Sequence, residues 1–202
     1  MSRSKFFSTI RYKHNNKLSQ SQVDGYEAIL DVFEKHPELT IPMKAYILAT
    51  VYHETAHTIQ AIAEYGKGST RVYGQWKTNS KGVKYCVKDG SRKTVYTQAD
   101  YPYLYYGRGH VQLTWWTNYK RMGDKLGYDL VNNPDLMLDN KISIEVLISG
   151  MVDGDFTGRK LANYFRHDMK DYINARKIIN GTDSANIIAG HARAFEQALT
   201  VL

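Results

Sequence analysis

Residues 45–66 constrain the fold most strongly, because they have the pattern of one long amphipathic helix. Thr40 and Pro42 are typical of a helix start, and Gly66 is typical of a helix end. Glu54 falls at the edge of the apolar stripe, where its carboxyl group would be partly shielded from solvent. The stripe itself consists of Ile47, Leu48, Val51, Thr55, Ile59 and Ile62.

One interpretation of this helix is a zinc peptidase, because residues 53–57 read H-E-T-A-H and match H-E-x-x-H. Such a site needs a third ligand. The longer form of the motif requires glycine and histidine where this chain has Gln60 and Ala63. The other common form takes a glutamate from a following helix, and the next glutamate after residue 64 is Glu145. We therefore expect no metal and no other cofactor, with His57 an ordinary helix-surface histidine.

A second interpretation pairs Glu54 with Glu64 as the two carboxylates of a glycoside hydrolase. One would deliver a proton to the leaving oxygen, and the other would activate water or attack the sugar. Ten residues of straight helix would separate the two by roughly 15 Å. Glu64 can therefore serve only if the helix ends before it; otherwise it is a solvated charge at the helix end.

The remaining pattern predicts a single, mainly α (α+β) domain over residues 1–202, with no separate wall-binding domain. Residues 66–104 are rich in glycine, lysine, serine, threonine and tyrosine, and they predict a small β-hairpin lobe flanking a cleft. Further helices are expected over 22–35, 118–126, 141–152, 171–179 and 185–199.

The charge is strongly positive, with 27 Lys and Arg against 20 Asp and Glu, a net +7. Such a surface favours polyanions. Residues 67–93 are the densest part, but no nucleic-acid-binding motif accompanies them, so we expect no nucleic-acid partner. The only cysteine, Cys86, predicts a fold without an internal disulfide. The sequence has neither a secretory signal pattern nor an apolar run long enough to insert stably in a membrane.

Four segments resemble glycoside hydrolase family 19, the chitinase and lysozyme-related group. The first is "ATVYHETAHT", similar to the family's catalytic helix. "YYGRGHVQLTWWTNY" is similar to G-R-G-x-x-Q-L-[ST]-x-x-x-N-Y, "LVNNPDLML" to L-x-x-N-P-D-L, and "ARKIINGTD" to the I-I-N-G motif. They follow in the family's order from about residue 45 to 182. The similarity is greatest to the phage endolysins of this group.

The resemblance implies a role for each matching residue. Glu54 would be the general acid, Glu64 the general base, and Thr114 the residue that holds the attacking water with Glu64. Arg108 would brace the cleft, and Arg193 would be an arginine near the C-terminus that neutralises the base. The residues expected to bind substrate are His53, Tyr106, Gln112, Asn118 and Asn180.

The sequence departs from the plant members of the family in two ways. They have a glycine pair after H-E-T, where this chain has Ala56 and His57. Their cysteine pairs are missing here as well. The distance along the chain from Glu54 to Glu64 is short, as in the phage members.

We therefore expect a muramidase that cleaves the β-1,4 bond between N-acetylmuramic acid and N-acetylglucosamine in peptidoglycan, with inversion. It would be a monomer, made in the host cytoplasm and released to the wall with a holin-type permeabilising partner. A chitinase would share the same catalytic frame. The zinc peptidase and a glycan-binding protein without activity are the two competing hypotheses from different functional classes.

Overall fold

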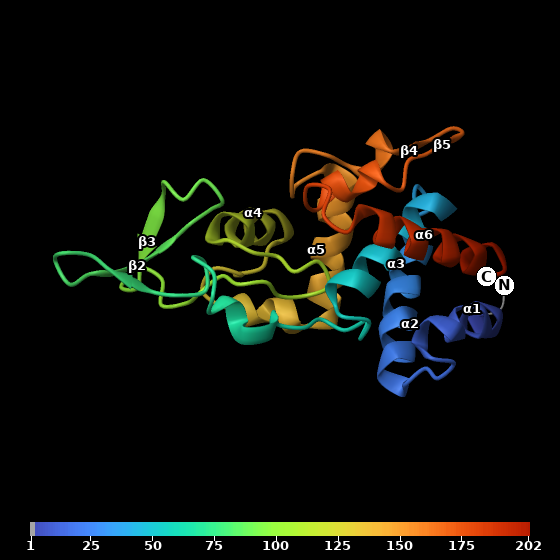
Figure 1. The fold of residues 1–202 in the computed structure, drawn as a ribbon, viewed down its shortest axis with the longest axis horizontal. Helices are drawn as coiled ribbons and strands as arrows, with labels where there is room; N and C mark the ends of the chain where they lie inside the picture. The colour runs from blue at the N-terminus through green and yellow to red at the C-terminus, as the bar shows by residue number, and fades with distance from the viewer. Residues whose placement is uncertain (1–2) are drawn as a thin grey trace. The chain divides into compact units, whose positions relative to one another are not determined.

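The computed structural model describes residues 3–202, which form two compact units. Unit 1 contains residues up to 60 together with 147–202, and unit 2 contains residues 61–146. Helices dominate and the strands are short (Figure 1), so the predicted mainly α fold with a small β lobe is confirmed. The assignment of the whole chain to one catalytic domain stays a prediction.

Unit 1 is helical and has an aromatic core. Its two central helices, α3 and α6, pack against each other, and α1 packs on α6. Tyr26 of α2 is fully buried, with its ring 5.8 Å from that of Phe6 and 5.9 Å from that of Phe195. The helical elements are α1 (Arg3–Ile10), η1 (Arg11–His14), α2 (Gln20–Glu34), α3 (Ile41–Glu54), the second half of α5 (Asn140–Asp153), η4 (Leu161–Asn163), η5 (Asn174–Ile178) and α6 (Ala185–Thr200).

The predicted helices over 22–35 and 185–199 are confirmed as α2 and α6. Ser19 and Gln22 form a reciprocal capping box at the start of α2. The apolar face predicted for α6 is buried. Its residues are Ile188, Ala192, Phe195 and Leu199.

The helix predicted to reach Gly66 ends at Glu54 instead. Thr55 explains the difference. Its hydroxyl donates to the Val51 carbonyl (2.8 Å) and accepts from the Ile59 amide (3.0 Å), which turns the chain away from the helix axis. The amide of His57 donates to the Tyr52 carbonyl, so the end is a Schellman-type cap. Residues 55 and 59 are still buried, which is why their spacing resembles a continuing helix.

The cap places residues other than glycine in the left-handed region. Ala56 has φ +48° and His57 has φ +69°. Residues with a Cβ adopt this conformation at a cost of about 1–2 kcal/mol, whereas glycine adopts it freely. The end of α3 therefore holds two strained residues.

The prediction of a helix over residues 171–179 is also wrong in part. Only the short 3₁₀ helix η5 forms there, beside a two-stranded hairpin of β4 (Phe165–Arg166) and β5 (Met169–Lys170). His167 lies in the hairpin turn with φ +49°. The sequence pattern predicts neither this hairpin nor α1.

Unit 2 contains the predicted β lobe as a three-stranded antiparallel sheet. Cys86 pairs with Tyr96 across β2 and β3, and both side chains are buried. The Cys86 thiol donates to the Val72 carbonyl (3.2 Å), which fixes the sheet to the preceding loop. The strands are β1 (Lys77–Thr78), β2 (Lys84–Val87) and β3 (Val95–Thr97).

Unit 2 also contains helices, and both helices predicted there are confirmed. It contains η2 (Tyr65–Gly68), α4 (Trp116–Leu126), η3 (Pro134–Leu138) and the first half of α5. Gly127 ends α4 in the left-handed conformation. Within residues 3–202, every helix is too short or too polar to cross a bilayer.

We expect Ala56→Gly to stabilise the protein by about 1 kcal/mol, because glycine relieves the strained conformation at the end of α3. Ala194→Gly in the interior of α6 is the matched control, and it should destabilise by about 1 kcal/mol. Urea unfolding monitored by circular dichroism measures both. Equal destabilisation by the two substitutions would contradict the assigned strain.

Candidate active site

Glu54 is the last residue of α3, and its carboxylate is held by an arginine. Arg176 of η5 donates from Nη1 to Glu54 Oε1 at 2.5 Å. The side chains of Glu54 and Arg176 are only 15% and 4% exposed, so little water screens the pair. Arg176 is itself fixed by donation from Nε to the Asp183 carbonyl (2.9 Å). The carboxyl group of Glu54 therefore has a defined orientation.

Arg176 is a site residue that sequence reasoning missed. Arg193, the arginine expected near the C-terminus, is exposed on α6. The one signal for Arg176 in the sequence is weak: it stands two residues before the first isoleucine of the I-I-N-G motif. Asn180 of that motif is exposed, and its side-chain oxygen accepts from the Gly181 amide (2.9 Å).

Glu64 lies in an extended segment just before η2, and both of its carboxylate oxygens accept hydrogen bonds. The Tyr73 hydroxyl donates to Oε1 (2.8 Å) and the Gly107 amide donates to Oε2 (3.1 Å). Burial, followed by the hydrogen bond to Glu64, raises the pKa of Tyr73 to about 12. Tyr73 therefore keeps its proton at neutral pH and acts as a donor. This geometry meets the condition that the helix end before Glu64.

Thr114 lies on a chain segment close to that of Glu64. Arg108 forms backbone bridges to both Ala63 and Leu113, the residues that precede Glu64 and Thr114. The Thr114 hydroxyl donates to the Gln112 carbonyl (3.0 Å), which leaves the hydroxyl oxygen able to accept. Beside these segments, the ring of Trp115 packs edge-on against Tyr73 at 5.0 Å.

Gln112 and Asn118 both use their amide groups to support the backbone. Gln112 has φ +52°, and its Nε2 donates to the carbonyls of Ile62 (3.1 Å) and Gly109 (3.0 Å). Asn118 Nδ2 donates to the Thr114 carbonyl (2.9 Å). The substrate-binding roles expected for these two residues stay predictions.

Arg108 has the contacts of a structural brace. It is 4% exposed and pairs through Nε with Asp135 (2.8 Å). Its guanidinium lies over the ring of Tyr106 (3.6 Å) and donates to the hydroxyl of Tyr119 (3.1 Å). Tyr106 is buried, so the ring predicted to bind substrate instead contacts Arg108 here.

Gly107, the first glycine of G-R-G, is required by close packing. A Cβ at this position would lie 2.8 Å from Gln112 Oε1 and 3.4 Å from the Glu64 side chain. Only glycine lets the backbone amide reach the carboxylate of Glu64 at this distance.

The predicted residues thus fall into two groups. Unit 1 carries the proton-donor candidate and two of the predicted binding residues: Glu54, His53 and Asn180. Unit 2 carries the base candidate and its surroundings: Glu64, Thr114, Tyr106, Arg108, Gln112 and Asn118.

The two histidines of H-E-x-x-H do not lie on one helix. His53 belongs to α3, whereas His57 lies beyond the helix end, so it is not the helix-surface histidine that we expected. Its ring instead stacks on Tyr52, with centroids 4.0 Å apart. The motif thus lacks the two successive helical turns on which a zinc peptidase depends. Nowhere in residues 3–202 do three His, Cys, Asp or Glu side chains converge as metal ligands would.

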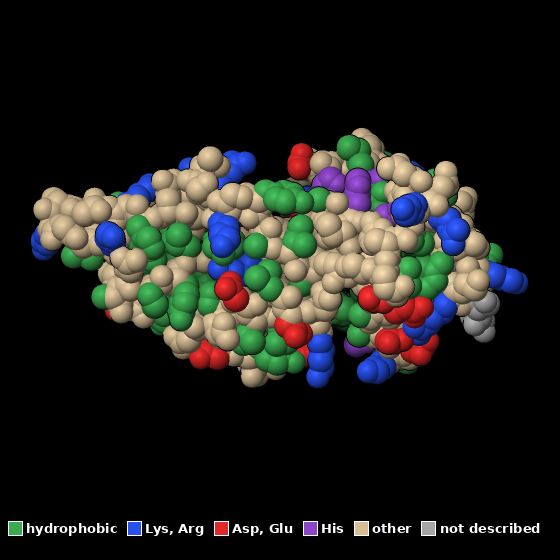
Figure 2. Space-filling view, turned by 90° about the horizontal axis from the view of Figure 1, so that it is seen from below, with side chains coloured by type: hydrophobic (Ala, Val, Ile, Leu, Met, Phe, Trp, Pro, Cys, Tyr) green, Lys and Arg blue, Asp and Glu red, His purple; other side chains and the backbone are tan. Residues whose placement is uncertain are grey.

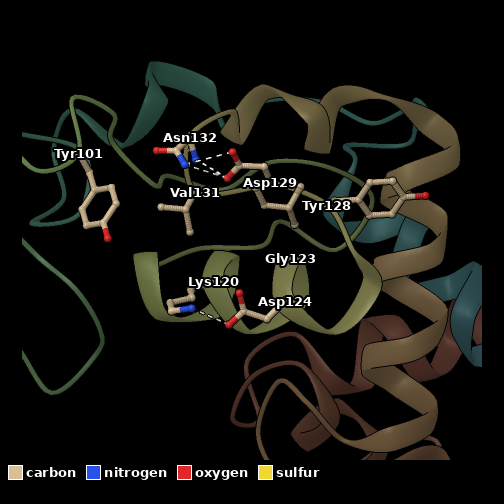
Figure 3. Close-up of a pocket in the computed structure, with 9 residues that line it drawn as sticks. Tyr101, Lys120, Gly123, Asp124, Tyr128, Asp129, Val131 and Asn132 are labelled. Atoms are coloured by element: carbon tan, nitrogen blue, oxygen red, sulfur yellow. Dashed lines mark hydrogen bonds and ion pairs between the residues drawn. The ribbon is translucent and has the colours of Figure 1, made fainter.

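An open pocket of about 410 Å³ lies elsewhere in unit 2, beside α4 (Figure 3). Asp129 and Asn132 are hydrogen-bonded to each other on one side, and Lys120 and Asp124 form an ion pair on the other. It contains none of the predicted catalytic or substrate-binding residues.

A cluster of basic groups packs around Tyr52, two residues before Glu54. Lys13 Nζ lies 2.9 Å from His191 Nδ1 and 4.7 Å from the centre of the Tyr52 ring. Burial, followed by nearby positive groups, lowers the pKa of His14 and of His191 to about 4. Both histidines therefore stay neutral in the folded protein at pH values where the unfolded chain is protonated.

We expect the free energy of unfolding to fall as the pH decreases from 7 to 5. The unfolded chain binds protons at these histidines near pH 6.5, whereas the folded protein binds them only near pH 4. The contribution of His14 is therefore fully present above about pH 6.5, and up to about 2 kcal/mol is lost by pH 5. His14→Gln should reduce this pH dependence, as measured by urea unfolding at several pH values. If the free energy of unfolding of the variant falls with pH as steeply as that of the parent, His14 is not the cause.

We expect Tyr73→Phe to lower kcat about tenfold with little change in KM, because Glu64 loses a donor that orients its carboxylate. Tyr65→Phe is the matched control, since Tyr65 adjoins Glu64 but is 79% exposed. The measurement is the initial rate of glycosidic bond cleavage. Identical rates for both variants would remove Tyr73 from the site.

Comparison with known proteins finds a family-level match. Residues 1–151 match the model of glycoside hydrolase family 19, described as chitinase class I. Endochitinase CH25 of Brassica napus is 27% identical over 152 residues, covering 70% of this chain and 44% of that protein. Inactive chitinase-like protein 1 of Hevea brasiliensis is 36% identical over 90 residues, covering 40% and 29%. The chain thus spans less than half the length of these curated relatives.

The fold is similar to that of chitinase C from Streptomyces griseus HUT6037. The TM-score is 0.60 at 20% identity, covering 98% of this chain and 76% of that one. Because the family model matches about three quarters of the sequence, the chain belongs to glycoside hydrolase family 19.

Proposed function

We propose that this chain hydrolyses β-1,4 bonds between N-acetylhexosamine units, with chitin-type polymers as its first candidate substrate. Family membership and the chitinases among its relatives support this substrate class. Because an inactive relative matches too, similarity alone does not carry the proposal. The observation that carries it is the oriented carboxyl group of Glu54, held by Arg176 in a largely desolvated place.

Glu54 acts as the general acid. Arg176 donates to Oε1 only, and within residues 3–202 Oε2 accepts no hydrogen bond. Oε2 is thus the oxygen that donates the proton to the glycosidic oxygen as the bond from that oxygen to the anomeric carbon breaks. When Oε2 carries the proton, the hydrogen bond that Arg176 donates to Oε1 limits the positions that Oε2 can take.

Glu64 acts as the general base. It accepts a proton from the water molecule that attacks the anomeric carbon. Tyr73 and the Gly107 amide hold the carboxylate in place. The Thr114 hydroxyl donates a hydrogen bond to the Gln112 carbonyl. Its oxygen is therefore suited to accept a hydrogen bond from the second hydrogen of that water.

Peptidoglycan is the second candidate substrate, and the charge of the protein favours it. Chitin is neutral, whereas the stem peptides of peptidoglycan carry carboxylates that a protein of net charge +7 attracts. In this case the enzyme would be a muramidase. As a lysis enzyme, it would reach the wall after a separate membrane-permeabilising protein had acted.

We expect Glu54→Gln to lower kcat by about 10²- to 10⁴-fold on a cleavable substrate, because the amide cannot donate the proton. The fold should be kept, as unfolding curves would show. Glu38→Gln, at an exposed glutamate, is the matched control and should leave kcat unchanged. Full activity of Glu54→Gln would overturn the proposed mechanism.

The two substrates are separated by parallel digests of chitin oligosaccharides and purified peptidoglycan. Mass spectrometry of the products identifies which sugar forms the new reducing end. Release of muramic acid ends supports the second candidate, and cleavage of chitin alone supports the first. Cleavage within the stem peptides of peptidoglycan that is lost with excess chelator would instead support the zinc peptidase.

A further inference from the structure

The positive charge of this chain is concentrated in one segment of unit 2. Residues 66–100, which we name the basic lobe, hold eight Lys and Arg and two Asp, a net +6. The other 167 residues therefore carry only +1 of the total +7. Lysine and arginine side chains are spread over the basic lobe, at the left of Figure 2.

The two acidic side chains of the basic lobe are used inside its own turns. Asp89 accepts from the Ser91 hydroxyl and amide and from the Thr94 hydroxyl, and it closes the turn between β2 and β3. Asp100 accepts from the Thr97 hydroxyl at 2.8 Å. Neither carboxylate pairs with a cation of the basic lobe.

The cations are free of ion pairs with any residue of 3–202. Seven of the eight are exposed, and the eighth, Lys88, lies with its Nζ 4.1 Å from the centre of the Trp116 ring. Unpaired charges of one sign at this density raise the local potential and attract a polyanion. The exposed members are Lys67, Arg71, Lys77, Lys81, Lys84, Arg92 and Lys93.

The basic lobe is continuous with the surroundings of the base candidate. Tyr73 donates to Glu64, and Val72 accepts from the thiol of Cys86 in β2. Lys67 and Arg71 lie on the short segment between Glu64 and Tyr73. A polymer held at Glu64 would therefore pass close to part of the positive surface.

We propose that the basic lobe is a docking surface for peptidoglycan. The carboxylates of its stem peptides, which are attached to the glycan strands, would bind to the exposed lysine and arginine side chains. The inference rests on the proposed function insofar as the bound polymer is the strand that is cleaved. In peptidoglycan, the stem peptides extend from the sugars of the glycan strand. When the sugars lie at Glu64, the carboxylates of the peptides can therefore contact lysine and arginine side chains of the basic lobe. A neutral chitin strand gains nothing from this surface.

The test compares two triple variants that remove the same charge. Lys77→Gln, Lys81→Gln and Lys84→Gln together lower the charge of the basic lobe from +6 to +3. Lys5→Gln, Lys17→Gln and Lys35→Gln remove three exposed lysines of unit 1 and serve as the matched control. Both sets are made in the Glu54→Gln background, so that binding is measured without cleavage.

Binding is measured by co-sedimentation with purified peptidoglycan sacculi free of teichoic acid, at 50 and 500 mM NaCl. We expect the triple variant of the basic lobe to bind at least fivefold more weakly at the lower salt concentration, and the control set to bind as the parent does. The higher salt concentration should weaken the binding of the parent to sacculi, so that the parent and the triple variant of the basic lobe bind with similar affinity. Sacculi whose carboxyl groups have been amidated with ethanolamine should bind all three proteins equally weakly.

Equal losses in both triple variants would overturn the proposal, because net charge alone would then explain binding. Tighter parent binding to single-stranded DNA or to anionic phospholipid vesicles than to sacculi, at equal salt, would overturn the choice of partner. Cleavage of neutral chitooligosaccharides by the same variants with Glu54 restored tests the proposed function separately. Its failure would leave the binding result intact.

Discussion

The hydrogen bonds of Thr55 decide where α3 stops, and the geometry of both carboxylates follows from that end point. The same turn leaves Glu54 as the last residue of the helix, where Arg176 reaches it. It also frees residues 61–64 to run extended beside residues 107–109, with Glu64 bonded to Gly107. A continuous helix to Gly66 would have excluded that pairing.

The spacing of apolar residues was sufficient to predict the helices that bury one face. The apolar spacing predicted α2, α5 and α6, and turn residues predicted the hairpins of the β lobe. It failed for α3 because buried residues beyond Glu54 kept helical spacing after the helix had ended. It also missed the hairpin of β4 and β5, whose two-residue strands are too short to show alternation.

The candidate site divides in the same way. Local motifs were enough to select Glu54, Glu64 and Thr114. Arg176 lies 122 residues from its partner Glu54, and Tyr73 belongs to a segment without a motif. Their roles depend on tertiary packing, which spacing along the chain does not encode. The concentration of positive charge in residues 67–93 could be read from the sequence, but the exposure of seven of the eight cations of the basic lobe could not.

The buried thiol of Cys86 makes the β lobe open to a direct chemical assay of its own stability. Burial raises the pKa of this thiol, so in the closed sheet it is both shielded and un-ionised. Because the sequence contains no other cysteine, an alkylating reagent would modify the chain at this position alone. The alkylation rate would then report how often Cys86 becomes exposed, either when the strands separate locally or when the whole chain unfolds.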